Sequence, residues 1–181
     1  MRTCNRIGGA RLVLFGVGFL LLSLIIPGQV QAQTVPLTQQ ETLDLLYLRE
    51  EEKLARDVYL VLSDMWKIRI FTNIAKSEQN HMDAVEVLLD RYGLADPAMG
   101  EGQFTPGSGL QGLYDNLIAQ GSISLTEALV VGVIIEKMDI TDLKEFLART
   151  NKFDLQTVYN NLLDGSENHL AAFTSQLAKR R

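Results

Sequence analysis

Four segments of this 181-residue chain carry apolar residues at alternating steps of three and four, the spacing that keeps one face of a helix buried against neighbouring helices. The segments span about residues 38–66, 70–92, 124–150 and 154 onward. No segment alternates apolar and polar residues with a period of two, as a half-buried strand would. The sequence therefore predicts an all-α protein built on four long, nearly parallel helices.

Local signals mark the ends of these helices. Thr38 opens a capping box, Gly93 is a C-terminal stop, and Asp154 is expected to cap the fourth helix. Short joins link the first helix to the second and the third to the fourth. A glycine-rich segment at 93–109 and a short helix at about 110–120 separate the second helix from the third. We expect a four-helix bundle with a long crossover between helices 2 and 3 and a short extra helix.

The first 32 residues have the parts of a secretory signal. Three arginines precede an apolar run at 12–26, and Val30-Gln31-Ala32 is a small-x-small cleavage site. We expect cleavage after Ala32, a periplasmic or secreted product, and one bundle domain at 33–181. An uncleaved membrane anchor is the less favoured alternative, because the apolar run is short for a membrane span.

The expected mature chain is acidic and has no thiol. The formal net charge of the whole chain is −5, and removing the three arginines of the first 32 residues, which hold no acidic residue, leaves −8. The single cysteine, Cys4, also lies in that segment, so no disulfide or thiolate metal site is expected in the remainder. A negative charge argues against nucleic acid as a partner and is compatible with attraction of cations.

Each predicted long helix has polar residues within its apolar stripe. They are Glu52 in the first, Glu78 and His81 in the second, Glu136 in the third, and Ser166 with His169 in the fourth. Because a buried lone carboxylate is costly, such residues indicate a partner or a metal ion. Carboxylates and imidazoles converging from four helices would hold two divalent cations. Ligands of this kind suit iron or manganese, with zinc as an alternative.

The two histidines of the chain, 88 residues apart, lie in the same short sequence pattern, Asn-His-apolar-x-Ala-apolar. Glu78 precedes His81 by three residues, which puts a carboxylate and an imidazole on one helix face. A histidine in an apolar stripe is more often a hydrogen-bonded core residue than a ligand. The repetition and the spacing of Glu78 favour the ligand interpretation here.

The residues around these positions resemble the ferritin-like superfamily and, within it, the domain of unknown function family 2202. The resemblance covers nearly all of the expected mature chain and rests on Glu50 to Tyr59, Phe71 to Met82, Ile135 to Ile140, and Gly165 to Leu170. It implies a di-iron carboxylate bundle, with Glu from two helices and Glu-x-x-His from the other two. The metal ligands that it implies are Glu52, Glu78, His81, Glu136 and His169.

One position departs from that pattern, because Ser166 stands three residues before His169 where a glutamate is expected. Glu167 is no substitute, since it lies about 200° round the helix from His169. Asp139 shares a helix face with Glu136 and is the better candidate for a further ligand. We therefore expect one tight and one weaker metal. On the first helix, Glu50 to Glu52 form a charge run, and such runs usually face solvent. The place of Glu52 in the apolar repeat favours it as the ligand, with Glu51 as the alternative.

These observations predict an exported di-iron protein that handles Fe(II) together with O2 or peroxide, by ferroxidase-like or peroxidase-like chemistry. The alternative is a non-catalytic metal-binding or structural bundle in which Ser166 marks a degenerate site. The sequence leaves open whether the protein is an enzyme. The expected partners are metal ions with O2 or peroxide, with membrane contact only through the export signal. A homodimer is compatible with the sequence.

Overall fold

A computed structural model describes Met1 and residues 35–180 of the chain. The predicted export signal, its cleavage site and Cys4 fall on residues outside the described range. Within that range no helix is both long enough and apolar enough to cross a membrane.

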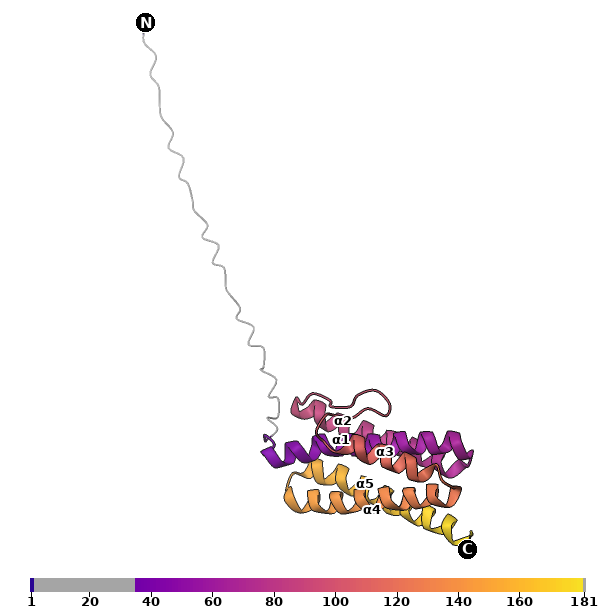
Figure 1. Ribbon diagram of the computed structural model, residues 1–181. Helices are drawn as coiled ribbons and strands as arrows, with labels where there is room; N and C mark the ends of the chain where they lie inside the picture. Colours follow the sequence, from indigo (N-terminus) through magenta and orange to yellow (C-terminus); the bar gives the residue numbers. More distant parts are fainter. Residues whose placement is uncertain (2–34, 181) are drawn as a thin grey trace. The chain divides into compact units, whose positions relative to one another are not determined.

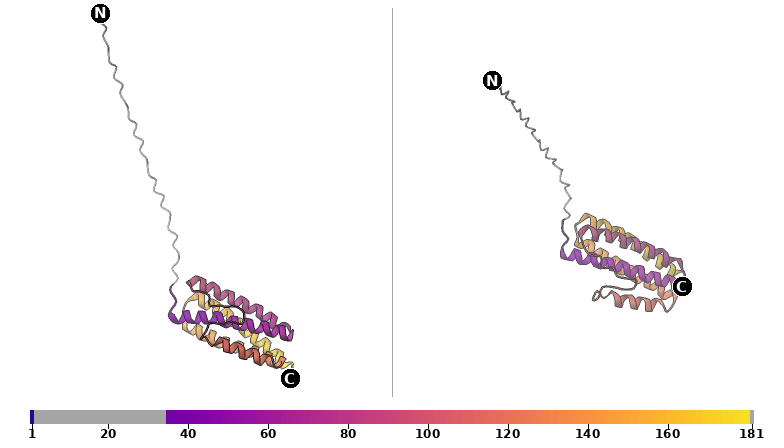
Figure 2. Two further views of the ribbon diagram at one scale, coloured as in Figure 1. Left: turned by 45° about the horizontal axis from the view of Figure 1, so that its top comes forward. Right: turned by 90° about the horizontal axis from the view of Figure 1, so that it is seen from above.

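The described chain is an all-α bundle, as the apolar spacing predicts, and no residue of 35–180 lies in a strand. Its helices are α1 (Gln39–Trp66), α2 (Arg69–Tyr92), α3 (Leu110–Gly121), α4 (Leu125–Arg149) and α5 (Phe153–Ala178). α1 packs along α2 and α4 along α5, while α3 contacts both α1 and α4 (Figures 1 and 2). The crossover that joins α2 to α4 contains α3. The predicted four long helices, long crossover and short extra helix are therefore confirmed.

Two of the three predicted helix ends are confirmed and one is wrong. Thr38 and Glu41 form the capping box of α1, and Gly93 ends α2 in the left-handed conformation with φ 67°. Asp154 does not cap α5, which begins one residue earlier at Phe153 with Lys152 in the cap position. Instead the Asp154 carboxylate accepts a hydrogen bond from the Tyr92 hydroxyl at 2.9 Å. The contact between α5 and the end of α2 takes the place of a local cap.

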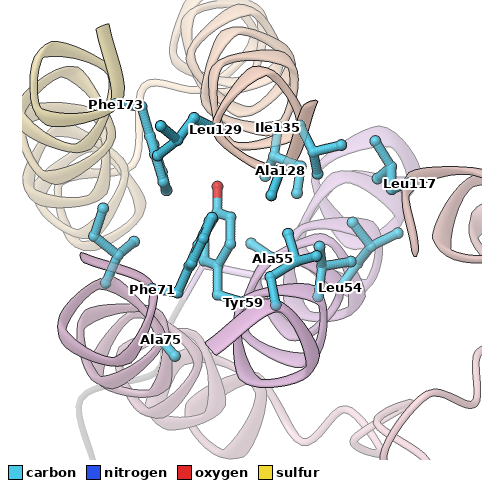
Figure 3. Close-up of a cluster of buried hydrophobic side chains, with 14 of the residues drawn as sticks. Leu54, Ala55, Tyr59, Phe71, Ala75, Leu117, Ala128, Leu129, Ile135 and Phe173 are labelled. Atoms are coloured by element: carbon cyan, nitrogen blue, oxygen red, sulfur yellow. The ribbon is translucent and has the colours of Figure 1, made fainter. Parts of the chain in front are cut away.

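The interior of the bundle is divided into two apolar clusters. In the first, the rings of Tyr59, Phe71 and Phe173 pack together with centroids 5.3–6.2 Å apart (Figure 3). The second contains leucines of α1 and α2, such as Leu48 and Leu88, with residues of α4 and α5. Each long helix contributes to both clusters, and between its two contributions stand the polar residues singled out in its sequence. The fold therefore places one buried polar layer across the middle of the bundle.

The acidic run Glu50 to Glu52 is buried throughout, because the crossover covers one side of α1 and the bundle core the other. The Glu50 carboxylate accepts a hydrogen bond from the Thr105 amide at 2.7 Å. Lys53, with no exposed surface, donates to Asp57 at 2.6 Å and to the carbonyl of Gln103 at 3.0 Å. The usual expectation that a charge run faces solvent is wrong here. Polar side chains of α1 hold the crossover in place on one side, which leaves Glu51 and Glu52 on the inner sides of the helix.

Candidate metal site

The structure brings together, in two overlapping groups, the five residues that the sequence resemblance implies as metal ligands. Glu52, Glu78 and His81 form one group, and Glu78, Glu136 and His169 form the other. In each group one potential ligand atom per residue lies within 4.8 Å of the others. Glu78 belongs to both groups, so its two carboxylate oxygens link the two halves of the site.

Both imidazoles turn their Nδ1 atoms toward the carboxylates. His81 Nδ1 lies 2.8 Å from Glu78 Oε2 and 3.2 Å from Glu52 Oε2. His169 Nδ1 lies 2.9 Å from Glu78 Oε1 and 3.4 Å from Glu136 Oε2. The two halves of the site are thus built alike, with one glutamate from α1 or α4, one histidine from α2 or α5, and Glu78 between them.

Several of these atoms are buried without a hydrogen-bond partner among the described residues. They are Glu52 Oε1, Glu78 Oε1 and His169 Nδ1. The short contact between the last two lacks hydrogen-bond geometry, although the atoms are only 2.9 Å apart. Unpartnered buried polar atoms are costly, and several lone pairs aimed into one small space are the arrangement that a cation satisfies. The donor set of carboxylate oxygens and imidazole nitrogens fits iron, manganese or zinc.

Without a metal, the imidazoles and carboxylates compensate one another. Burial alone would lower the pKa of His81, but its contacts with Glu52 and Glu78 raise it to about 11. Burial would likewise lower the pKa of His169, but its contacts with Glu136 and Glu78 raise it to about 9. Burial raises the pKa of Glu52 and Glu136 to about 7, whereas two imidazole contacts lower that of Glu78 to about 2. The metal-free site therefore holds protons that a cation must displace.

Two neighbouring residues fix the positions of the possible ligands. The Tyr59 hydroxyl, fully buried, donates a hydrogen bond of 2.6 Å to Glu136 Oε1. Gly165 of α5 faces the back of the His81 ring, where an added Cβ would lie 2.6 Å from Nε2. Only glycine leaves room for the ring in this position. The interruptions of the apolar stripe do not single out Gly165, although a glycine inside a helix is unfavourable and signals a packing role.

Asp139 and Ser166 meet at the edge of the site. Ser166 Oγ is hydrogen-bonded to Asp139 Oδ2, and both residues are buried. The other oxygen, Asp139 Oδ1, has no partner among the described residues. Asp139 belongs to neither three-residue group. Asp139 thus lies beside position 166, while its role as a ligand stays a prediction.

Glu51 and Glu52, which the sequence left as alternatives, face different partners. Glu52 contacts His81, and Glu51 is equally buried but lies near Asp139 and Asp142. Burial and these carboxyl groups raise the pKa of Glu51 well above its usual range. Neither carboxylate oxygen of Glu51 has a hydrogen-bond donor among the described residues. The geometry therefore favours Glu52 as the α1 member of the histidine groups and leaves Glu51 as a separate buried acid.

Comparison with known proteins gives a family and a fold. The profile of the family described as "Uncharacterized protein domain (DUF2202)" matches residues 41–181. The uncharacterized protein MJ0754 of Methanocaldococcus jannaschii is 46% identical over 144 residues, which cover 78% of this chain and 77% of that protein.

Two solved structures are similar to the bundle. The crystal structure of hypothetical protein MJ0754 has a TM-score of 0.79 at 44% identity and covers 81% of this chain and 85% of its own. A DUF305 fragment from Deinococcus radiodurans has a TM-score of 0.60 at 15% identity and covers 80% of this chain and 99% of its own. The second likeness concerns the fold alone.

Proposed function

The chain belongs to the DUF2202 family, and we propose that it is a di-iron protein of the ferritin-like superfamily that handles Fe(II) together with O2 or peroxide. Buried acidic and histidine groups capable of binding metal are a feature of the structure. The identity of the metals, the reaction and the export of the protein are parts of the proposal.

The observation that carries the proposal is the shared position of Glu78. Its two oxygens lie 2.8 Å and 2.9 Å from the Nδ1 atoms of His81 and His169, so one carboxylate faces two imidazoles at once. A carboxylate in a purely structural ion pair needs only one imidazole partner. A carboxylate between two histidines, with a further glutamate beyond each, is the arrangement of a bridging ligand in a carboxylate bundle.

Each residue of the site has a part in the proposed chemistry. Glu52 with His81 would hold one ion, Glu136 with His169 the other, and Glu78 both. Two ferrous ions bound there would supply the two electrons that reduce H2O2 to water or O2 to H2O2. The apolar clusters above and below the polar layer exclude bulk water. The Tyr59 hydroxyl orients Glu136 by occupying one of its oxygens.

Ser166 supports a second candidate function, a metal-binding bundle without turnover. Its short side chain is hydrogen-bonded to Asp139, so the α5 half of the site lacks the carboxylate that would complete a symmetric pair. The three glutamates carry a charge of −3 against +4 for two divalent ions. A bound hydroxide or Asp139 would have to compensate, because uncompensated charge in a core is costly.

Two measurements test the proposal. The purified protein is loaded with Fe(II) without oxygen and its metal content determined. It is then mixed with O2 or H2O2, and the oxidation of iron is followed. We expect up to two ions per chain and oxidation faster than that of free Fe(II), with both lost in Glu78→Gln. Metal binding without accelerated oxidation would favour the second candidate. A metal content unchanged in Glu78→Gln would exclude both.

A further inference from the structure

Carboxylates recur at every third position along α4, from the core to the surface. Glu136 is 1% exposed and Asp139 5% exposed, Asp142 is half-buried, and the side chain of Glu145 is 62% exposed. Steps of three residues advance about 4.5 Å along a helix. The candidate metal site is therefore joined to the surface by a row of closely spaced acidic groups on one helix.

A further buried acid faces this row from α1. Glu51 is 1% exposed, and the charged groups that act on it most strongly are Asp139 and Asp142. Among the described residues, neither carboxylate oxygen of Glu51 has a hydrogen-bond partner. Asp139 has a partner for one oxygen, Oδ2, and none for the other. These two carboxyl groups are thus unsatisfied in the interior, next to a site that has its own ligands.

The outer end of the row opens into a surface groove between α1 and α4. Asp142, Tyr47 and Asp44 line it, together with Gln40, Leu43, Glu145, Phe146 and Arg149. Arg149 is paired with Asp44 at 3.1 Å and lies 3.8 Å from Glu145. None of the ion pairs within residues 35–180 includes Asp142. The groove therefore presents a carboxylate that is in no ion pair, beside the buried Glu51 and within the electrostatic influence of Arg149.

We propose that Asp142, Glu51 and Asp139 form a transient binding path that conducts divalent cations from the α1–α4 groove to the candidate metal site. This inference rests on the proposed function, since it needs a metal destination. Burying these acids costs the metal-free bundle stability, because a carboxyl group without a cation is satisfied there only by holding a proton. Carboxylates along a narrow path instead raise the local cation concentration and replace lost hydration oxygens one step at a time.

Rates of metal uptake test the path. Metal-free protein is mixed with Co(II) in a stopped-flow instrument and the visible absorption of the bound ion is followed. Equilibrium titration is measured in parallel. In Asp142→Asn we expect loading slowed about tenfold or more, with the final stoichiometry and affinity unchanged. Glu51→Gln, which keeps the volume of the buried side chain, should slow loading in the same way.

Asp90→Asn is the matched control, because it removes the same charge from an exposed position on α2, which contributes nothing to the groove. Its loading rate should equal that of the wild type. The path is overturned if Asp142→Asn loads at the wild-type rate, if Asp90→Asn slows loading equally, or if Asp142→Asn lowers the final metal content. A wild-type protein that binds no Co(II) at equilibrium would overturn the proposed metal site as well as the path. Normal binding with normal rates in the variants would overturn the path alone.

Discussion

The imidazole rings of His81 and His169 stack across the middle of the bundle, with centroids 5.6 Å apart and planes inclined by 24°. Each ring turns Nδ1 to the same carboxylate, that of Glu78. Two groups that both tend to be protonated would repel each other at this distance, so the arrangement depends on the carboxylates or on a cation between them.

Replacing His81 should remove most metal binding, and replacing His169 should have the smaller effect. Each histidine has an adjacent glutamate, Glu52 or Glu136, but Glu78 precedes His81 by three residues whereas Ser166 holds that position before His169. Metal content and affinity of His81→Ala and His169→Ala would be compared by titration. Two equal and independent sites in the wild type would contradict this asymmetry.

Ser166→Glu should strengthen the second metal site and weaken the metal-free protein. The new carboxylate would supply the missing charge near His169, but it would also meet Asp139 in a position that is fully buried. We expect overpacking and repulsion to cost about 1–3 kcal/mol in the metal-free state. Thermal unfolding with and without bound metal measures both effects. An unchanged second affinity in a folded variant would be evidence against the metal role of this position.

Gly165→Ala should lower metal affinity although alanine is the better helix former. The added methyl group would lie 2.6 Å from His81 Nε2 and must displace the ring. Gly112→Ala is the matched control, because Gly112 lies inside α3 with nothing within 4 Å of the added atom. The control should gain about 0.5–1 kcal/mol of stability and leave metal binding unchanged. Equal metal affinity in both variants would show that Gly165 does not position His81.

Tyr59→Phe should destabilise the protein by about 1–3 kcal/mol, because Glu136 Oε1 loses its buried donor. The lost hydrogen bond should also raise the pKa of Glu136 further, since the Tyr59 hydroxyl helps to hold it down. Metal affinity at Glu136 and His169 should therefore fall more steeply below neutral pH than in the wild type. Denaturant unfolding and titrations at two pH values measure these effects. A loss of stability without any change in the pH profile would assign Tyr59 to packing alone.

The stability of the metal-free protein should fall as the pH rises from neutral to 10. The pKa values of His81 and His169 are raised to about 11 and about 9, so their stabilising charge is fully present below pH ~6.5 and is lost toward those values. Glu52 and Glu136, with pKa raised from 4.5 to about 7, act in the same direction at lower pH, between those two values, because the unfolded chain ionises them earlier. Metal affinity should rise over the same range, since cations compete with protons. Thermal unfolding with a chelator and titrations in two buffers provide the test, and a stability that increases with pH would contradict it.

Much of this protein follows from spacing within single helices. The three-four steps predict each long helix and its inward face. The interruptions of those steps predict the buried polar residues of the metal layer, because position on a helix face is a property of about two turns of chain, but they do not predict the burial of Glu50, Lys53 or Asp57. The long crossover between the second and third long helices follows from the glycine-rich segment. Glu78 and His81 are the clearest case, since the three-residue spacing alone places them side by side.

The remaining relationships depend on how helices are rotated and shifted against one another, which no local pattern encodes. Glu51 and Glu52 differ by about 100° round α1, and only the packing of α2 and α4 decides that Glu52 meets His81 while Glu51 meets Asp142. The contact of Ser166 with Asp139 and the binding of Asp154 by Tyr92 likewise join residues that are 27 and 62 positions apart. The sequence by itself determined the helices and the composition of the polar layer. The tertiary structure decided which members of that layer touch, because such contacts require the balance of packing over the whole core.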